Sequence, residues 1–510
     1  MSTNGNANGH SHGEADVLQW KVGLINGAKY LTAETFGFKV NASGAGLKKR
    51  QTWILEQDTK DEVVYIRSHL GRYISTDKYG KVTCEKEADE REETERFVVE
   101  YAKDGSGRWA FKNRKEGNYL GRTGEDVQCF SKTVTDTELW VVQLAIHPQV
   151  NLRNVNRKRY AVLCDDEIQC KENVPWGEAG LIILHFHEGK YSLKTCDNRF
   201  LHRDGSLVSE LENDAKFTLE IRSGAACGLA FKDCKGYYLT AVGSTATMKG
   251  GKNKAVGKDE LFTLEDSHPQ VALMSTNNKK FVSVKQGVDL SANQAEFCEK
   301  STFQMEFDKP SQKWSFRTTA DNNKYWALES FGGIQATCMT VCNKSLFGVE
   351  FIGDGTIIIT ADNGNCLYNK QTGSILANVE NPESATRFTL RMINRPFLIL
   401  KCDFGFVDLK SPTAAKPELV CSKTTYAVTF LEPLDDGQYY LKALNNKYWI
   451  VADDNSLLAD SDTGTCPFLI EFRGQSLISI KAPNGKYLKG EQNSFVAKGE
   501  EIDSSTLWEY

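Results

Sequence analysis

The sequence predicts an all-β protein made of short repeated units, because two phrases recur along its 510 residues. One phrase is a turn residue followed by a basic, an aromatic and an aliphatic residue, as in Asn26-Gly-Ala-Lys-Tyr-Leu31, and it is typical of the start of a strand. The other is an aromatic residue followed by apolar residues and often Glu, as in Trp53-Ile-Leu-Glu56. Copies of the second phrase, about 41 residues apart on average, lie at Trp53, Phe97, Trp140, Phe217, Phe262, Phe303, Phe347, Phe388, Phe468 and Trp508, with weaker copies near Ile182 and Ala427.

A repeat of about 41 residues made of short strands fits either a β-propeller or a β-trefoil. The tetrapeptide His-Pro-Gln-Val occurs at 147–150 and again at 268–271, 121 residues or three units later, and a looser relative begins at Asn394. A trefoil restarts after every third lobe, whereas a propeller has no reason to mark every third blade. One lobe cannot bury its apolar face alone, and three lobes make the smallest closed core. The sequence therefore predicts four tandem β-trefoil domains with twelve lobes.

We expect the four trefoils to span residues 17–145, 146–267, 268–391 and 392–510, after a polar, disordered tail at 1–16. The joins between them, such as "LAIHPQV" in the first, are short and apolar rather than rich in Gly and Ser. Short apolar joins favour domains packed into a compact unit over domains on flexible tethers.

Composition and charge exclude several classes of function. The net charge of −5 argues against a dedicated nucleic-acid binder, so polyanion binding would need local basic patches. No run approaches the ~20 apolar residues of a membrane helix, and the first residues lack the apolar core of a secretory signal. We therefore expect a cytoplasmic protein whose 14 cysteines are free thiols.

Signals for catalysis or metal binding are weak, and we predict a protein that is not an enzyme and needs no cofactor or metal. No Ser/His/Asp or Cys/His constellation and no phosphate-binding glycine-rich loop stands out. His185 and His187 share one face of an expected strand and His202 follows, but their spacing does not match a zinc site. The pair in Cys338-Met-Thr-Val-Cys342 has no further ligand nearby and is expected in the core.

Longer stretches of the chain resemble the fascin family of actin-bundling proteins. They are "LINGAKYLTAETFGFKVNASGAGLKKRQ" from residue 24, "HPQVN" from 147, "VPWG" from 174, "GGIQAT" from 332 and the terminal "LWEY". The resemblance runs from about residue 22 to the last residue. It implies a monomeric, cytoplasmic protein that cross-links actin filaments into parallel bundles in filopodia and similar protrusions, without inserting into membranes.

The strongest candidate site is the basic triplet Lys48, Lys49 and Arg50. The preceding "NASGAG", residues 41–46, lacks bulky side chains and is expected to form a hairpin or loop tip. Actin filaments are acidic polymers, so clustered cations would steer and hold the encounter. The resemblance implies that this region belongs to a main actin-binding surface. The alternative is a solvated turn, which is the commonest fate of such a triplet.

Weaker candidates are spread over the other domains. Asp403 and Gly405 fall where the family pattern has an acidic residue and a glycine linked to bundling, although a glycine in a turn needs no function. Each remaining cation, taken alone, is better explained as an ordinary surface residue, and only as a set do they indicate contact with actin. These cations are Arg157 and Lys158, Lys249 in an expected mobile glycine-rich loop, and Lys370, Lys401 and Lys410, which match basic positions of the family.

The chain departs from the family pattern at one regulatory position. Fascins typically carry a phosphorylatable serine immediately before the Leu-Lys-Lys of this region, and here that residue is Gly46. Ser43 and Thr52 flank the cations instead. A phosphate on either adds about −1.5 to −2 charges and would offset the cations. We therefore hypothesise that a kinase acts on Ser43 or Thr52.

Two other classes of trefoil protein fit the sequence less well than a filament cross-linker. Lectin-like trefoils carry Gln-x-Trp once per lobe, but only Gln51-Thr-Trp53 and Gln312-Lys-Trp314 fit here, and at different phases of the repeat. We keep carbohydrate binding only as the alternative to the filament cross-linker. Growth-factor and protease-inhibitor trefoils are usually single secreted domains, which does not fit four domains without a signal.

Overall fold

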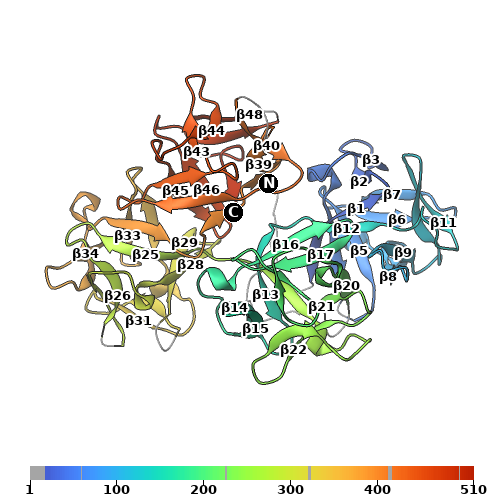
Figure 1. The fold of residues 1–510 in the computed structure, drawn as a ribbon, viewed down its shortest axis with the longest axis horizontal. Helices are drawn as coiled ribbons and strands as arrows, with labels where there is room; N and C mark the ends of the chain where they lie inside the picture. Colours follow the sequence, from blue (N-terminus) through green and yellow to red (C-terminus); the bar gives the residue numbers. More distant parts are fainter. Residues whose placement is uncertain are drawn as a thin grey trace. The chain divides into compact units, whose positions relative to one another are not determined.

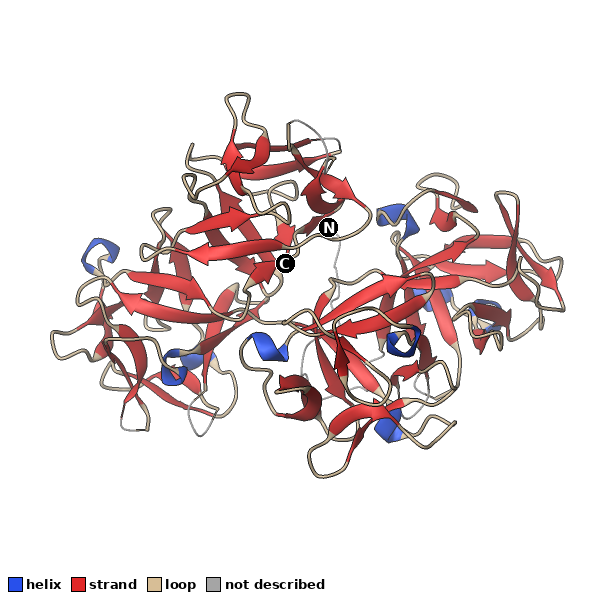
Figure 2. Cartoon of the chain, in the orientation of Figure 1, coloured by secondary structure: helices blue, strands red, loops and turns tan. Residues whose placement is uncertain are grey.

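The computed structural model describes residues 18–58, 60–223, 227–285, 287–319, 323–411, 416–492 and 494–510. The tail predicted at 1–16 lies outside these ranges. The chain forms two compact units, one of Met1–Pro175 with Ala179–Glu265 and one of Trp176–Glu178 with Asp266–Tyr510. The regular elements of the described residues are β-strands and short 3-10 turns (Figure 2). Among these residues no helix is long and apolar enough to cross a lipid bilayer.

Six strands of the first trefoil close a barrel, in which each strand pairs antiparallel with the next. The ring is completed because β1 pairs with β12 and a bridge between Trp109 and Trp140 joins β9 to the start of β12. Three hairpins, β2–β3, β6–β7 and β10–β11, cap the barrel. The barrel strands are β1 (Gln19–Asn26), β4 (Trp53–Gln57), β5 (Val64–Ser68), β8 (Phe97–Tyr101), β9 (Trp109–Asn113) and β12 (Val141–Leu144) (Figure 1). The hairpin strands are β2 (Lys29–Ala33), β3 (Val40–Gly44), β6 (Tyr73–Thr76), β7 (Val82–Lys86), β10 (Tyr119–Thr123) and β11 (Asp126–Ser131).

In the first trefoil each lobe consists of a barrel strand, a capping hairpin and a second barrel strand. The second and third trefoils repeat this order. The second contains β13 (Gln149–Asn154), β14 (Arg159–Cys164), β15 (Glu167–Glu172), β16 (Ile182–His187), β17 (Lys190–Lys194), β18 (Phe200–Leu201), β19 (Leu207–Val208), β20 (Thr218–Arg222), β21 (Gly228–Lys232), β22 (Leu239–Val242), β23 (Thr247–Gly250) and β24 (Phe262–Asp266). The third contains β25 (Gln270–Ser275), β26 (Phe281–Lys285), β27 (Asp289–Gln294), β28 (Phe303–Asp308), β29 (Lys313–Thr318), β30 (Tyr325–Leu328), β31 (Ile334–Cys338), β32 (Gly348–Phe351), β33 (Thr356–Thr360), β34 (Cys366–Asn369), β35 (Ile375–Val379) and β36 (Phe388–Met392).

The fourth trefoil differs only in its first barrel strand, which is split into two short pieces, β37 (Phe397–Leu398) and β38 (Lys401–Cys402). β37 pairs with β41 and β38 pairs with β49, so the ring still closes. Its remaining strands are β39 (Gly405–Leu409), β40 (Leu419–Lys423), β41 (Thr429–Pro433), β42 (Tyr439–Lys442), β43 (Tyr448–Val451), β44 (Leu457–Ser461), β45 (Leu469–Gly474), β46 (Leu477–Lys481), β47 (Tyr487–Glu491), β48 (Ser494–Gly499) and β49 (Trp508–Glu509). The predicted all-β fold of four β-trefoils is confirmed, and we keep the predicted domain limits as a proposal.

One buried apolar residue per lobe stands where that lobe closes. The residue that begins each copy of the second recurring phrase stands at or just before the last barrel strand of its lobe. All twelve of these residues are buried. Truncating such a core aromatic to Ala costs about 3–5 kcal/mol of folding free energy. The buried positions are Trp53, Phe97, Trp140, Ile182, Phe217, Phe262, Phe303, Phe347, Phe388, Ala427, Phe468 and Trp508.

A short 3-10 turn leads into most of these lobe-closing residues. All of the turns except η2 and η9 end two residues before the residue that closes the lobe. The turns of the described residues are η1 (Lys49–Gln51), η2 (Ala88–Glu90), η3 (Glu93–Glu95), η4 (Glu178–Gly180), η5 (Asn213–Ala215), η6 (Lys258–Glu260), η7 (Glu299–Ser301), η8 (Asn343–Ser345) and η9 (Pro382–Ser384).

Within each unit a buried tyrosine ties one trefoil to the next. The Tyr191 hydroxyl donates to the Val142 carbonyl (2.9 Å) and accepts from the Leu144 amide (2.7 Å). In the second unit Tyr439, 248 residues later, accepts from the Met392 amide (2.9 Å). One continuous core runs through both trefoils of each unit. The expectation of packed domains is therefore met inside each unit, and the packing of all four into one body stays a prediction.

Two glycine pairs lie at the same seams and show the same spacing. Gly107 and Gly189 in the first unit correspond to Gly355 and Gly437 in the second, 248 residues later, and all four have positive φ. A Cβ atom on Gly107 would lie 2.6 Å from the Gly189 carbonyl oxygen. Only glycine allows the two backbones to approach this closely in this conformation.

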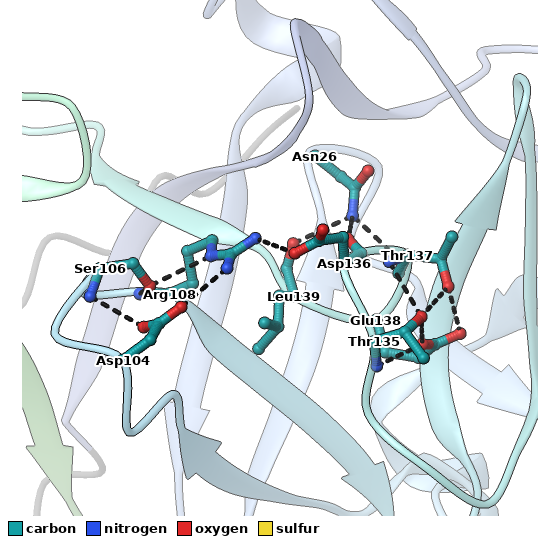
Figure 3. Close-up of polar contacts among 9 residues, drawn as sticks. All are labelled: Asn26, Asp104, Ser106, Arg108, Thr135, Asp136, Thr137, Glu138 and Leu139. Atoms are coloured by element: carbon teal, nitrogen blue, oxygen red, sulfur yellow. Dashed lines mark hydrogen bonds and ion pairs between the residues drawn. The ribbon is translucent and has the colours of Figure 1, made fainter.

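Asn26 holds the turn that closes the first barrel. Its Nδ2 atom, at the end of β1, donates to the carbonyl oxygens of Asp136 (2.9 Å), Thr137 (3.1 Å) and Leu139 (3.0 Å) (Figure 3). Asn113 and Asn154 make the same kind of contact with the turns that precede Phe97 and Phe262. Carbonyl groups in the segment before a lobe-closing aromatic accept from an amide side chain, and two of them, those of Thr137 and Arg96, also accept from a backbone N–H.

Replacing Asn26 by Ala should lower the free energy of unfolding by about 1–3 kcal/mol, because three part-buried carbonyl groups would lose their hydrogen bonds to a buried amide. The measurement is equilibrium unfolding in urea. The matched control is Asp136→Asn, which only weakens the exposed ion pair between Asp136 and Arg108 (2.7 Å) and should cost less than about 1 kcal/mol. Equal costs for the two variants would contradict a structural role for the Asn26 amide.

Candidate functional site

The stretch that leads to the basic triplet is a strand and not the predicted loop tip. Residues Val40–Gly44 form β3, in which Asn41 pairs with Thr32 on one side and Asp126 on the other. The hairpin tip lies earlier, at 34–39, where Gly37 and Phe38 have positive φ. The small residues serve packing: a Cβ atom on Gly44 would lie 2.6 Å from the Gln51 side chain. The expectation of a tip at residues 41–46 is therefore wrong.

The three cations stand on the turn η1, with Lys48 as its N-cap. Lys48, Lys49 and Arg50 are exposed, whereas Gln51 is buried and donates from Nε2 to the Thr32 hydroxyl (3.1 Å). The turn thus presents three consecutive side chains to solvent and anchors the fourth. We call these three cations the η1 surface.

Equivalent turns show that the fold requires this geometry but not this charge. The same pattern of mostly exposed residues before a buried fourth recurs at η3, η5, η6, η7 and η8. At these turns the residues in place of the triplet are Glu92-Glu93-Thr94, Glu212-Asn213-Asp214, Gly257-Lys258-Asp259, Cys298-Glu299-Lys300 and Cys342-Asn343-Lys344. None of the five carries more than one cation, so three on η1 are a feature that structural need does not explain.

Most of the charge of the η1 surface is left free. Arg50 pairs with Glu34 (Nη1 to Oε2, 2.8 Å), an exposed contact worth at most about 1 kcal/mol. Lys48 and Lys49 have no ion pair with any described residue. Unpaired cations on a surface are available to an acidic partner.

The structure adds neighbours that the sequence did not indicate. His69, in the turn between β5 and β6, has a pKa below its ordinary value of 6.5, because of burial first and then of the nearby Lys49 and Arg50 charges. Phe36, 87% exposed, lies on the hairpin tip that Glu34 begins, beside the turn to which Arg50 belongs. Exposed aromatics beside cations are typical of protein interfaces. His69 and the triplet come from different lobes, so only the folded chain brings them together.

The two candidate phosphorylation positions are connected to the η1 surface. The Ser43 hydroxyl donates to Asn41 (2.6 Å), whose Nδ2 donates to Glu34 (2.8 Å), the partner of Arg50. The Thr52 hydroxyl donates to the carbonyl oxygen of Lys48 (3.1 Å). A phosphate at either place would enter a network that already positions these cations.

The candidates of the second trefoil differ in how much of their charge is free. Arg157 is exposed, but its Nη2 atom donates to the carbonyl oxygens of Ala241 (3.0 Å) and Gly243 (3.2 Å). Lys158, with a φ of 54°, is exposed and has no ion pair among the described residues. Lys249 is half-buried in strand β23, so its placement in a mobile loop is wrong. Lys249 pairs with Thr240 of the neighbouring strand β22. The glycines around Lys249 in the sequence suggested a loop and gave no sign of this pairing.

In the second unit only one candidate lysine is fully free. Lys370 is exposed at the hairpin tip between β34 and β35 and has no ion pair in the described part of the chain. Lys401 pairs with Glu509 (Nζ to Oε2, 2.7 Å) and Lys410 pairs with Glu418 (3.0 Å). Acidic partners offset most of the field of these two lysines.

Gly405 has a structural reason to be glycine. Its φ is +140°, and a Cβ atom there would collide with the carbonyl oxygen of Lys423 on the neighbouring strand. Asp403 is exposed in the turn between β38 and β39. The backbone alone accounts for the glycine, so this position gives no independent sign of filament binding.

No grouping of side chains in the described ranges points to metal binding. They contain no group of three or more His, Cys, Asp or Glu that could hold a metal ion. Trp53 and Trp314, from the two Gln-x-Trp matches, are buried and offer no ring face to a sugar. Cys338 and Cys342 do not lie in the core, since the first is half-buried and the second exposed.

Titration of His69 tests the geometry around the η1 surface. In the double variant Lys49→Glu and Arg50→Glu, the pKa of His69 should rise, because two positive charges that oppose protonation become negative. NMR titration of the imidazole, assigned with His69→Gln, gives the measurement. Because the folded pKa is lowered, stability should fall as pH drops through about 6.5 toward that value. An unchanged pKa in the double variant would place the cations too far away.

Comparison with known proteins places the whole chain in one family. The Fascin domain model matches four times, at residues 27–142, 150–264, 277–390 and 413–510. Fascin-2 from Bos taurus is 40% identical over 506 residues, which cover 98% of this chain and 100% of that protein. Fascin from Strongylocentrotus purpuratus is 35% identical over 97% of this chain and 99% of its own length. A designed three-fold symmetric protein, ThreeFoil, aligns with a TM-score of 0.22 and 16% identity over 24% of this chain and 97% of its own. The chain belongs to the fascin family.

Proposed function

We propose that this protein is a non-enzymatic cross-linker that binds actin filaments and organises them into tight parallel bundles in cytoplasmic protrusions. The observation that carries the proposal is the match to the fascin family along the whole chain, in all four repeats. The sequence motifs around residues 24–51 resemble the actin-binding region of that family. The η1 surface supplies a physical basis, because it holds uncompensated cations on a protein whose net charge is −5.

Contact with a filament is expected to start from electrostatic attraction. Two lysines without acidic partners among the described residues and one weakly paired arginine stand side by side, so their fields add over one small area. The exposed Phe36 nearby can bury apolar surface once the filament is in place. Charge then sets the rate of encounter and the apolar contact slows dissociation.

Cross-linking needs at least two filament-binding surfaces on one molecule. The first unit carries the η1 surface and Lys158, and the second carries Lys370, which is also exposed and unpaired among the described residues. We rank these above Arg157, Lys249, Lys401 and Lys410, whose side chains are half-buried or held by other groups of the protein. Asp403 and Gly405 rank last. No specific observation favours the carbohydrate-binding alternative.

Reversing the charge of the η1 surface should abolish bundling. In the variant Lys48→Glu, Lys49→Glu and Arg50→Glu, filament affinity should fall at least about tenfold, because attraction becomes repulsion. Low-speed and high-speed co-sedimentation with actin filaments separate bundling from simple binding. Added salt should weaken binding by the unmodified protein, since exposed charges are screened.

The matched control changes three scattered exposed lysines of the same trefoil, Lys78, Lys103 and Lys115, to Glu. This control has the same net charge as the test variant but keeps the η1 surface, and it should still bundle. Unchanged bundling by the test variant, with both proteins folded, would remove the η1 surface from the proposal.

Phosphate mimics at the flanking positions should weaken filament binding. The double variant Ser43→Asp and Thr52→Asp adds negative charge to the network of Glu34 and Arg50 and beside Lys48, and we expect about a threefold to tenfold loss of affinity. The control is Ser43→Ala with Thr52→Ala, which adds no charge and should bind normally. Full binding by the Asp variant would rule out both positions as the regulatory switch.

A further inference from the structure

Two cysteine thiols meet on the surface of the third trefoil. Cys338 is the last residue of β31, and Cys342 is the N-cap of η8. Their Sγ atoms are 3.4 Å apart. Cys342 is exposed and Cys338 is half-buried, so small molecules in solution can reach the pair. Neither the fold nor the proposed contact with filaments gives these two thiols a role.

The segment between the thiols leaves room for them to approach further. A disulfide bond is about 2.05 Å long, so the sulfur atoms need to move together by roughly 1.4 Å. The intervening residues, Met339, Thr340 and Val341, are all exposed, and Met339 is 71% exposed. Because nothing packs over these residues, a small rotation of either side chain does not disturb the core.

We propose that Cys338 and Cys342 are a modification site that forms a reversible intrachain disulfide by exchange with a low-molecular-weight disulfide such as oxidised glutathione. The Cys342 thiolate attacks one glutathione sulfur, the glutathione disulfide bond breaks, and one glutathione thiolate leaves. Cys338 gives its proton to solvent and attacks Cys342 Sγ, which expels the second glutathione thiolate. Two protein thiols are oxidised, and one glutathione disulfide is reduced to two thiols.

The surroundings fix the order of these two attacks. Burial and the neighbouring Cys342 thiol raise the pKa of Cys338 above its ordinary value of 9.0. The thiolate is the attacking species, so the exposed Cys342 reacts first and Cys338 resolves the mixed disulfide. The ring closed by this bond contains only the few residues between the cysteines, so it stabilises the fold less than a disulfide that closes a long loop. The closed form would tie the end of β31 to the start of η8.

The preceding lobe of the same trefoil supplies a natural control. Cys298 is the N-cap of η7, with φ and ψ of −145° and 167°, close to the −150° and 172° of Cys342. The residue that corresponds to Cys338 in that lobe is Gln294, the last residue of β27. Cys298 therefore has the backbone setting of Cys342 without a second thiol. Its sulfur instead faces the Ser301 hydroxyl at 3.4 Å.

The test is treatment of the folded full-length protein with oxidised glutathione, followed by blocking of free thiols and tryptic mass spectrometry. Trypsin separates the pair, on peptide 325–344, from Cys298, on peptide 286–300. We expect peptide 325–344 to carry no blocking group, to have a mass about 2 Da below that of its unblocked dithiol form, and to regain both thiols with dithiothreitol. Cys298 should stop at a mixed disulfide with glutathione or stay reduced. Two free or two glutathionylated thiols on peptide 325–344 would overturn the proposal.

Two variants test the role of each partner. In Cys338→Ser, Cys342 should stop at the mixed disulfide, and circular dichroism shows whether the fold is kept. In Gln294→Cys, a second pair is built at the equivalent turn, and peptide 286–300 should then also have a mass about 2 Da below that of its unblocked dithiol form. Failure of this second pair to close would overturn the claim that the strand end and the N-cap position the two thiols.

Discussion

Every other feature of the molecule depends on the burial of one apolar side chain, usually a large aromatic one, where each lobe closes. The residues at these positions, from Trp53 to Trp508, are almost wholly excluded from solvent. Each of these contacts is non-local, since it joins lobes that lie tens of residues apart, and three lobes must be present before any one of them is protected. The core is therefore collective, and it leaves the turns and hairpin tips outside it free to change composition. Lys48 and Lys49 can stand on η1 because the fold asks only that Gln51 point inward.

The seams within each unit extend this constraint from one barrel to two. Tyr191 and Tyr439 satisfy backbone groups of the preceding trefoil, and the glycine pairs let the two backbones touch. The recurrence of both devices 248 residues later shows that the second unit repeats the first at the level of packing as well as of fold. A trefoil anchored in this way cannot rotate on its neighbour without breaking a buried hydrogen bond. Within a unit, surface charges therefore keep fixed mutual positions, which a protein that grips a regular polymer requires.

The repeat predicted the fold because core spacing is a property of the sequence itself: a residue that must be buried in every lobe recurs at the lobe's own period. Local structure is harder to predict from the sequence where a segment pairs with strands that lie far away along the chain. The small residues Asn41–Gly44 look like a loop but form a strand, since pairing with β2 and β11 outweighs their weak strand propensity. Lys249 was misplaced for the same reason. The sequence places Cys338 and Cys342 in the core because free cysteines usually are buried, yet the end of β31 leaves the first half-buried and the N-cap position of η8 leaves the second exposed. His69 lies near Lys49 although the two residues belong to different lobes. No sequence pattern around either residue indicates this proximity.

The fold places few constraints on which exposed residues occupy the turns before the lobe-closing residues. The turns η1, η3, η5, η6, η7 and η8 bury their last side chain and offer most of the residues before it to solvent. On η1 those residues are cations, on η3 they are mostly acidic, and on η8 they begin with a cysteine that meets a second one. Since the core tolerates all of these, the differences between turns reflect demands made outside the fold. Binding and modification are therefore expected on these turns and on the hairpin tips beside them, where the scaffold fixes position without fixing identity.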